Sequence, residues 1–283
     1  MSAPWFSVVI PVYNEKNVIP ELVNRCVKSL CSTGKTFEIV FVDDGSTDGT
    51  YELLVRYSTG ARIQIERLAQ NHGQFQATLA GLRAAKGRWI AVLDGDLQDP
   101  PEVIKDLIYA IDRSPENISV VFAVKTSRRE ALWFRFLRSL YGFLLFAGGV
   151  KIPASAGSYC LLRREVAQRI ANLRIRHCNL AAAVAWTRPD WCMVPYNKEA
   201  RYDHNSRVGL FGLLRESIGS LLISGALFRL GAVTSGAIIL ISTLILMDFI
   251  SGNTWLGISG IVIGALLITG ILIIKSRISD KDF

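Results

Sequence analysis

The sequence predicts an α/β domain with a mostly parallel sheet, followed by a membrane-anchoring tail. Up to about residue 127, short apolar runs alternate with amphipathic segments, which is the pattern of a doubly wound parallel sheet. After about residue 230, long uncharged apolar runs replace this alternation. The chain has 283 residues, enough for one large domain with an appendage.

Short β-rich runs give the expected strands, and segments with helical periodicity give the expected helices. The strands are expected at residues 7–12, 37–42, 63–68, 89–93 and 120–124. The helices are expected at residues 18–31, 48–57, 73–85 and 101–113. Asp99 precedes two prolines, so it is expected to start the last of these helices.

The C-terminal part is expected to cross a membrane twice. Residues 255–274 carry no charge and would span about 30 Å as a helix, the thickness of a bilayer core. Together with the preceding apolar run they predict transmembrane helices at about 230–250 and 255–274, within a tail at 230–283. A pair of buried core helices is the alternative. Arg229 precedes the spans and Lys275 follows them, which predicts cytoplasmic termini.

Two amphipathic segments stand between the α/β pattern and the tail. Residues 210–229 repeat leucine and isoleucine at helical spacing, which predicts a juxtamembrane helix lying in the bilayer interface. Residues 131–146 are also rich in apolar residues with basic residues between them. In either segment, the apolar residues could instead pack on the domain core. The expected globular domain covers residues 1–209, and its part at about 128–209 faces the membrane.

The charge content limits the classes of possible partner, and the cysteine content limits the possible metal and disulfide sites. Lys and Arg number 32 against 24 Asp and Glu, an excess that suits a membrane surface, a phosphorylated substrate or nucleic acid. The basic residues adjoin the membrane segments, which argues against nucleic acid. Five cysteines without a C-x-x-C pair argue against a zinc site or a disulfide framework and favour reduced cytosolic thiols.

Acidic loops follow three of the expected strands. Asp94 and Asp96 come after the fourth strand, Asp43 and Asp44 after the second, and Glu15 after the first. The carboxyl ends of parallel strands share one sheet edge, where α/β folds bind ligands. Carboxylate oxygens suit Mg²⁺ or Mn²⁺, so a nucleotide with a divalent cation would explain the cluster. The alternative is a set of solvated turns, and this structural role is expected for Ser46 and Asp48.

Four motifs in this order resemble those of family 2 glycosyltransferases with the GT-A fold. They are PVYNE at 11–15, VDDGSTDGT at 42–50, NHGQ at 71–74 and DGDLQDPP at 94–101. With two C-terminal spans, the chain is more closely similar to polyprenyl-phosphate glycosyltransferases, namely dolichyl-phosphate mannose synthases and bactoprenol glucosyltransferases. The resemblance covers most of the chain.

The resemblance implies a role for each matching residue. The implied nucleotide-binding residues are Pro11, Tyr13, Glu15, Asp43 and Asp44. The implied sugar and metal contacts are Asp94, Asp96 and Gln98, with Asp96 and Asp94 holding Mg²⁺ or Mn²⁺. The candidates for the acceptor phosphate are Arg128, Arg129, Arg201 and Arg207. Of these residues, Asp94, Asp96, Arg128, Arg201 and Arg207 are the expected catalytic set.

One departure from the family bears on the acceptor. Relatives often carry an acid where this chain has Ser158, so no general base carries over to this position. A phosphate monoester has a second pKa of about 6, so a lipid phosphate needs no base. The expected reaction is therefore inverting transfer of one sugar from a nucleotide-diphosphate sugar, by resemblance a UDP-sugar, to undecaprenyl or dolichyl phosphate.

Two other functions stay open. The first is transfer to a lipid or glycan hydroxyl, and the second is a non-catalytic membrane subunit. The expected location is the bacterial inner membrane, with the catalytic domain in the cytoplasm. The apolar spans offer surfaces for a homo-oligomer.

Overall fold

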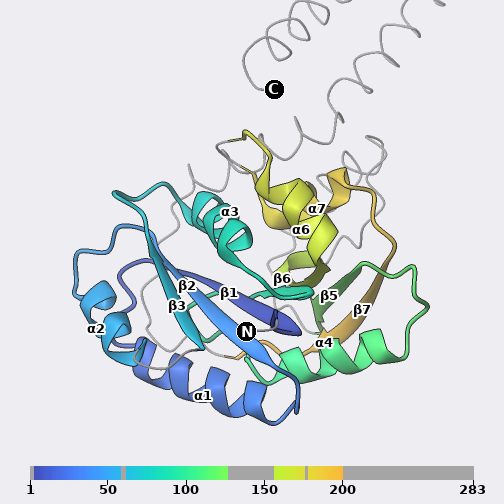
Figure 1. The fold of residues 1–283 in the computed structure, drawn as a ribbon, viewed down its shortest axis with the longest axis horizontal. Coiled ribbons are helices and arrows are strands. Elements are labelled where there is room, and N and C mark those ends of the chain that lie inside the picture. Colours follow the sequence, from blue (N-terminus) through green and yellow to red (C-terminus); the bar gives the residue numbers. More distant parts are fainter. Residues whose placement is uncertain (1–2, 59–61, 127–155, 176–177, 200–283) are drawn as a thin grey trace, which may run out of the picture. The chain divides into compact units, whose positions relative to one another are not determined.

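A seven-stranded sheet forms the centre of the part of the chain that the structure describes (Figure 1). The computed structural model describes residues 3–58, 62–126, 156–175 and 178–199, all within one compact unit of the chain. The strand order is β3-β2-β1-β4-β6-β5-β7. Strand β1 pairs in parallel with β2 and β4, β2 pairs in parallel with β3, and β5 pairs in parallel with β7.

The alternation of strands and helices predicted for the first half of the chain is confirmed. Element ends differ from the predicted ones by a few residues at most. The strands are β1 Phe6–Val12, β2 Phe37–Asp43, β3 Ile63–Arg67, β4 Trp89–Val92 and β5 Val120–Lys125. The helices are α1 Ile19–Cys31, α2 Thr50–Tyr57, α3 Gln74–Ala84 and α4 Val103–Asp112.

Four further elements follow, which were not predicted from the sequence pattern. They are β6 Ala156–Arg163, α6 Arg164–Ala171, α7 Leu180–Trp186 and β7 Trp191–Tyr196. Strand β6 runs antiparallel between β4 and β5, so the sheet is mixed at this side and parallel elsewhere. Pro195 lies in β7, which is an edge strand, a position where the missing N–H costs no ladder hydrogen bond.

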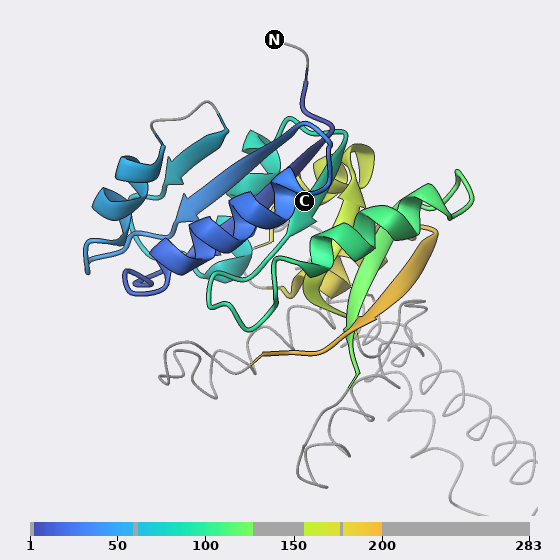
Figure 2. The same ribbon diagram turned by 90° about the horizontal axis from the view of Figure 1, so that it is seen from below.

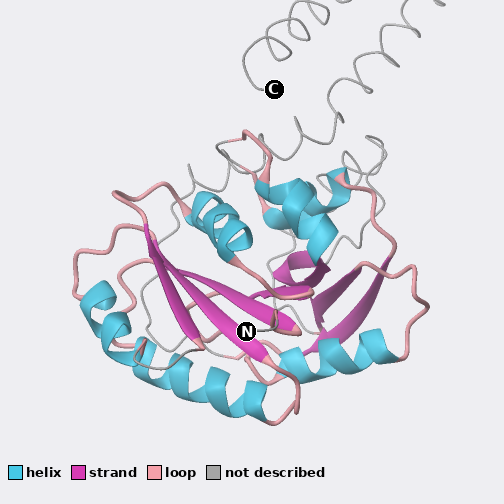
Figure 3. Ribbon diagram, viewed as in Figure 1, coloured by secondary structure: helices cyan, strands magenta, loops and turns pink. Residues whose placement is uncertain are grey.

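Helices cover both faces of the sheet. Helices α1, α2 and α4 pack on one face, and α3, α6 and α7 on the other (Figures 2 and 3). Because both faces are covered, every residue of β1 is buried, as expected for a central parallel strand. On the α3 face, a Cβ at Gly81 would lie 2.3 Å from Val9 Cγ1, so this helix can approach the strand only with glycine there.

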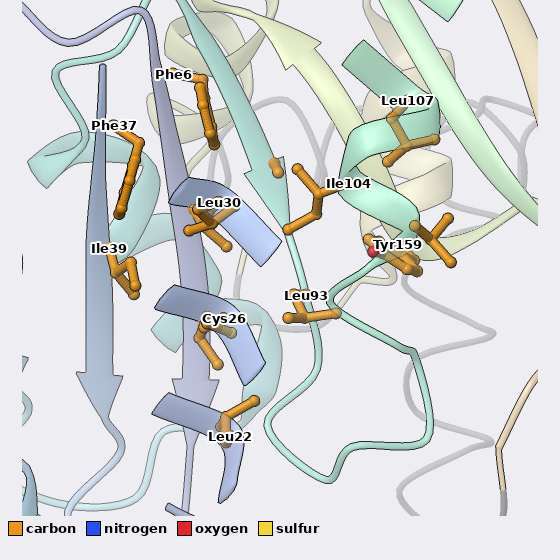
Figure 4. Packing of buried hydrophobic residues seen from close by; sticks show 14 of the residues in the cluster. Phe6, Leu22, Cys26, Leu30, Phe37, Ile39, Leu93, Ile104, Leu107 and Tyr159 are labelled. Carbon is orange, nitrogen blue, oxygen red and sulfur yellow. The ribbon is translucent and has the colours of Figure 1, made fainter. Parts of the chain in front are cut away.

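The main hydrophobic core lies between the sheet and the face formed by α1 and α4. Phe6, Leu30 and Ile104 are completely buried in it, and Tyr159 contributes a ring whose hydroxyl reaches the Pro100 carbonyl (Figure 4). Burial of each large side chain stabilises the fold by roughly 1.5–3 kcal/mol. This core fixes the ends of β1 and β4, from which two of the acidic loops emerge.

The predicted membrane segments lie outside the described residues. These are the spans at 230–250 and 255–274, the juxtamembrane helix at 210–229 and the amphipathic segment at 131–146. The proposed boundary at residue 209 lies outside them too. Within the ranges that the structure describes, no helix combines the length and hydropathy needed to cross a bilayer.

Candidate functional site

The loop after β4 carries the paired carboxylates and is folded tightly against β1. A Cβ at Gly95 would lie 2.7 Å from Val12 Cγ1 and 3.0 Å from the Pro11 carbonyl oxygen. Leu97 has a positive φ of 57° and is buried. Gly95 and Leu97 are buried, whereas the alternate residues Asp94, Asp96 and Gln98 are partly exposed.

Asp94 is held on both carboxylate oxygens by side chains from other elements. Gln74 Nε2, at the start of α3, donates to Oδ1 at 2.6 Å. Ser158 Oγ, in β6, donates to Oδ2 at 3.0 Å. Desolvation raises the pKa of Asp94 to about 7, and the nearby carboxylates of Asp99 and Asp96 add to this effect. The carboxylate is thus oriented by neutral donors while its negative charge is poorly compensated.

The carboxylates fit a hard divalent cation. Asp96 Oδ1 accepts the backbone N–H of Gln98 at 3.1 Å, which fixes the turn. A cation would relieve the repulsion that raises the pKa of Asp94. Across the described ranges, no three His, Cys, Asp or Glu side chains form a complete metal site. The remaining oxygen ligands would therefore come from water or substrate, as is usual for Mg²⁺.

The loop after β2 holds two buried carboxylates with different partners. Asp43 is fully buried. Its Oδ1 accepts the Ser46 N–H at 3.3 Å, whereas Oδ2 accepts no hydrogen bond and lies 3.5 Å from Arg67 Nε. An unsatisfied buried acceptor is costly without a ligand. Asp43 therefore offers a ready acceptor for a donor group on a bound molecule.

Asp44 has a clear structural role. Its two oxygens accept the backbone N–H groups of His72 and Gly73, each at 2.8 Å. Burial raises its pKa, and these two hydrogen bonds oppose that shift. Asp44 thus orders the turn that leads into α3 and to Gln74, the partner of Asp94.

The loop after β1 is tied to the loop after β2. The Asn14 N–H donates to Ser46 Oγ at 2.9 Å, and the Thr47 N–H donates to Asn14 Oδ1 at 2.8 Å. Asp48 accepts the N–H groups of Thr50 and Lys16. Ser46 and Asp48 therefore have the structural role predicted for them.

The first-strand residues of the motif lie at the same sheet edge. Pro11 is buried in β1, beside Val42 of β2. Tyr13 and Glu15 follow the strand and are partly buried. The structure thus brings the acidic loops of β1, β2 and β4 together, as the sequence predicts.

The expectation that Asp99 starts the next helix is wrong. Helix α4 begins at Val103, and the buried Asp99 carboxylate accepts a hydrogen bond from the Tyr196 hydroxyl of β7. Lys125 Nζ lies 3.8 Å from the same oxygen. Asp99 therefore joins the carboxylate loop to the ends of β5 and β7, and only the tertiary pairing of these strands reveals this role.

A cavity of about 230 Å³ opens beside Asp94. It lies between the beginnings of α3, β6 and α7. Its lining includes polar side chains, namely Gln74, Thr78, Ser158 and Asn179, together with apolar surface from Phe75 and Leu180. The volume suits a monosaccharide-sized group with polar substituents rather than a fully apolar ligand.

The four candidate arginines lie outside the described residues: Arg128, Arg129, Arg201 and Arg207. The strands that lead to them are described. Strands β5 and β7 end next to each other, and the Thr126 N–H donates to the Tyr196 carbonyl at 3.0 Å. The Glu199 N–H donates to the Gln98 carbonyl at 2.9 Å. Both arginine-bearing segments therefore start at the carboxylate edge.

Comparison with known sequences identifies the family. The profile described as Glycosyl transferase family 2 matches residues 7–171. The chain is 30% identical over 278 residues to an uncharacterized glycosyltransferase, YkcC, of Bacillus subtilis (strain 168), covering 95% of this chain and 85% of that protein. An undecaprenyl-phosphate 4-deoxy-4-formamido-L-arabinose transferase of Pseudomonas paraeruginosa (strain DSM 24068 / PA7) is 42% identical over 132 residues. That match covers 46% of this chain and 38% of that transferase, so the chain spans less than half of its length.

Solved structures show the same fold. Glucosyl-3-phosphoglycerate synthase from Mycobacterium tuberculosis, in complex with Mn²⁺, UDP-glucose and phosphoglyceric acid, has a TM-score of 0.56 at 18% identity, over 78% of this chain and 80% of that chain. The same enzyme with Mg²⁺ and UDP has a TM-score of 0.57 at 19% identity, over 78% and 79%. The likeness establishes an α/β GT-A fold with a mostly parallel sheet. The chain therefore belongs to glycosyl transferase family 2.

Proposed function

We propose that this enzyme transfers one sugar, with inversion, from a UDP-sugar to a polyprenyl phosphate, undecaprenyl or dolichyl phosphate, at the cytoplasmic face of a membrane. The observation that carries the proposal is the setting of Asp94. Its carboxylate lines the cavity and is held by the neutral Gln74 and Ser158. Such a site can bind the donor sugar, yet position 158 holds a hydroxyl instead of a carboxylate base.

The donor would bind across the loops of β1, β2 and β4. Pro11, Tyr13 and Glu15 would line the nucleotide pocket, and Asp44 would reach the ribose with its remaining lone pairs. The buried Oδ2 of Asp43 would accept the N–H of the base. UDP-glucose or UDP is bound in the glucosyl-3-phosphoglycerate synthase structures that share this fold.

The transferred sugar and the diphosphate would lie at the β4 loop. Asp94 and Gln98 would contact the sugar-nucleotide, while Asp96, with Asp94, would hold Mg²⁺ or Mn²⁺. When bound, the cation would offset the negative charge of the leaving diphosphate. The partly exposed carboxylates and the charge they concentrate support this assignment.

The acceptor would supply its own nucleophile. A phosphate oxygen would attack the anomeric carbon on the face opposite the nucleoside diphosphate. The new bond joins that carbon to the acceptor oxygen, the bond to the donor's β-phosphate breaks, and the configuration inverts. A phosphate monoester carries a second pKa of about 6, so the step needs alignment and charge stabilisation, not a base. Arg128, Arg129, Arg201 and Arg207 would clamp the acceptor phosphate.

The membrane assignment rests on the sequence of the tail and on the relatives' names. The curated transferases with 38–42% identity act on undecaprenyl phosphate according to their names. Residues 1–209 would form the cytoplasmic catalytic domain, 210–229 the juxtamembrane helix, and 230–250 and 255–274 the spans. A homo-oligomer would be formed through these apolar spans.

Mass spectrometry of the lipid product tests this proposal. The full chain, in detergent with Mg²⁺ or Mn²⁺, receives polyprenyl phosphate and a mixture of nucleotide sugars. We expect one lipid product, which carries a single sugar on its phosphate. The reaction should release UDP from the donor. Glycosylated hydroxyl acceptors with no lipid-phosphate product would support the alternative glycosyltransferase function. A cellular phenotype that persists in Asp96→Asn would support a non-catalytic membrane subunit.

A further inference from the structure

Arg25 of α1 binds two carboxylates that come from distant parts of the chain. Its Nε and one terminal nitrogen donate to the two oxygens of Glu102, at 3.0 and 2.7 Å. Its terminal nitrogens also donate to both oxygens of Glu199, at 2.8 and 2.9 Å. The Arg25 side chain is only 21% exposed, so solvent screens these charge-assisted bonds less than at an open surface. One guanidinium thus joins the start of α4 to the chain that follows β7.

The planar guanidinium is the group that suits this arrangement. Arginine offers five N–H donors in a fixed fork, and Arg25 makes four hydrogen bonds with them. Glu102 and Glu199 both lie within hydrogen-bonding distance of this one group, so without it their negative charges would repel each other. Arg25 therefore holds together two segments that would otherwise separate.

The carboxylate loop, residues 94–102, depends on such partners from other elements. Pro100 and Pro101 have no backbone N–H to donate, so this half of the loop is held through its carbonyl groups. The Pro101 carbonyl accepts the Ser29 hydroxyl at 3.0 Å, and the Pro100 carbonyl accepts the Tyr159 hydroxyl at 2.8 Å. Helix α1, which packs beside α4 (Figure 2), thus supports the loop at more than one point.

An unbroken series of hydrogen bonds leads from Arg25 to Asp96. Arg25 fixes the Glu199 carboxylate, and the Glu199 N–H donates to the Gln98 carbonyl at 2.9 Å. The Gln98 N–H in turn donates to Asp96 Oδ1 at 3.1 Å. At its other end the loop reaches Glu102, which the same guanidinium holds. Arg25 therefore acts on both ends of the segment that carries Asp96 and Gln98.

We infer that Arg25 is a positioning residue for Asp96 and Gln98, the part of the donor site that would hold the cation and diphosphate. It acts through Glu199 and Glu102 rather than by touching the donor. Without these contacts the segment gains conformational freedom, and binding must then supply the free energy that orders it. This inference rests on the proposed function, because it takes Asp96 to hold a divalent cation beside the donor diphosphate.

Calorimetric titration of the full chain with UDP, once with Mg²⁺ and once with EDTA, tests this inference. We expect Arg25→Gln to raise the Kd for UDP in Mg²⁺ roughly fivefold. The Kd in EDTA should stay unchanged, because Asp43 and the loops after β1 and β2 keep their contacts. Arg25→Lys should recover only part of the affinity, because one ammonium cannot serve two carboxylates in bidentate fashion. Lys28→Gln, at an exposed cation of the same helix, is the matched control and should change neither Kd.

A second variant keeps the test informative if Arg25→Gln does not fold. Glu199→Gln leaves the contact between Arg25 and Glu102 in place, and it should also weaken UDP binding in Mg²⁺ alone. Unchanged UDP binding in Mg²⁺, with or without a lower Tm, would overturn the inference. Equal weakening in Mg²⁺ and EDTA would also overturn it, because the network would then support the fold as a whole. A wild-type enzyme that binds UDP equally well in both conditions would instead contradict the cation assignment of the proposed function itself.

Discussion

The hydroxyl of Ser158 donates a hydrogen bond to Oδ2 of Asp94 at 3.0 Å. This contact joins β6 to the loop after β4 and fixes the direction in which Asp94 faces the cavity. An acid at position 158 would place a second carboxylate beside Asp94 and raise the pKa of that group further. The serine is therefore compatible with a reaction in which the acceptor arrives already ionised.

Substituting Ser158 should affect catalysis more than stability. In Ser158→Ala, Asp94 loses one of its two side-chain donors, and we expect kcat to fall about tenfold. Ser158→Asp should lower kcat further, because the new carboxylate would repel the carboxylate of Asp94. Ser119→Ala, at the opposite edge of the sheet, is the control and should leave kcat unchanged. Unaltered kinetics in Ser158→Ala would show that this hydrogen bond does not position Asp94.

Gly95→Ala should displace the carboxylate loop. The new methyl group would lie 2.7 Å from Val12 Cγ1, and relief of such a clash in a packed site costs about 1–3 kcal/mol. We expect a lower Tm together with a strong loss of turnover. Gly157→Ala is the control for stability, because no atom lies within 4 Å of its added Cβ. Equal Tm values for the two variants would contradict the close approach to β1.

The Tyr196 hydroxyl should stabilise the fold through Asp99. Tyr196→Phe leaves the buried Asp99 carboxylate without this donor, and we expect the free energy of unfolding to drop by about 1–3 kcal/mol. Tyr109→Phe on α4 is a matched control at an exposed tyrosine. Thermal or denaturant unfolding measures the difference. Identical unfolding of both variants would mean that Lys125 alone compensates the Asp99 charge.

Asp43 should determine nucleotide affinity through Oδ2, the carboxylate oxygen that accepts no hydrogen bond. Asp43→Asn can place an amide donor where the acceptor Oδ2 now lies, so we expect UDP to bind roughly ten- to a hundredfold more weakly. Asp190→Asn, an exposed acid before β7, is the control. Calorimetric titration with UDP provides the measurement. Wild-type affinity in Asp43→Asn would exclude a direct contact between this carboxylate and the base.

The sequence predicted the elements and loops that depend on local pattern. Continuous apolar runs marked strands such as β1 and β4, because a strand covered on both faces has no polar alternation. The same parallel order placed Asp43, Asp94 and Glu15 at one edge. Ser46 and Asp48 were recognisable as turn residues because they lie in a short segment rich in Gly, Asp and Ser, and Asp48 accepts the N–H of Thr50 only two residues further on.

Contacts between distant segments could not be read from the sequence. Asp99 looked like a helix start beside two prolines, yet its partner is Tyr196, on a strand whose pairing with β5 the local pattern does not reveal. Gln74 stood in a recognised motif without an assigned role, and only the fold places it against Asp94. Antiparallel β6 was missed because its first residues, including Ser158, are small or polar, and its burial follows from the strands on either side.

Comparing polyprenyl phosphate with unphosphorylated polyprenol tests the central claim most directly. The two acceptors differ only in the group that would carry the nucleophile, and Asp96→Asn serves as the inactive control. We predict UDP-sugar-dependent addition of one sugar to polyprenyl phosphate by the wild type, none to polyprenol, and none to either by Asp96→Asn. Efficient glycosylation of polyprenol, or full activity of Asp96→Asn, would contradict the account.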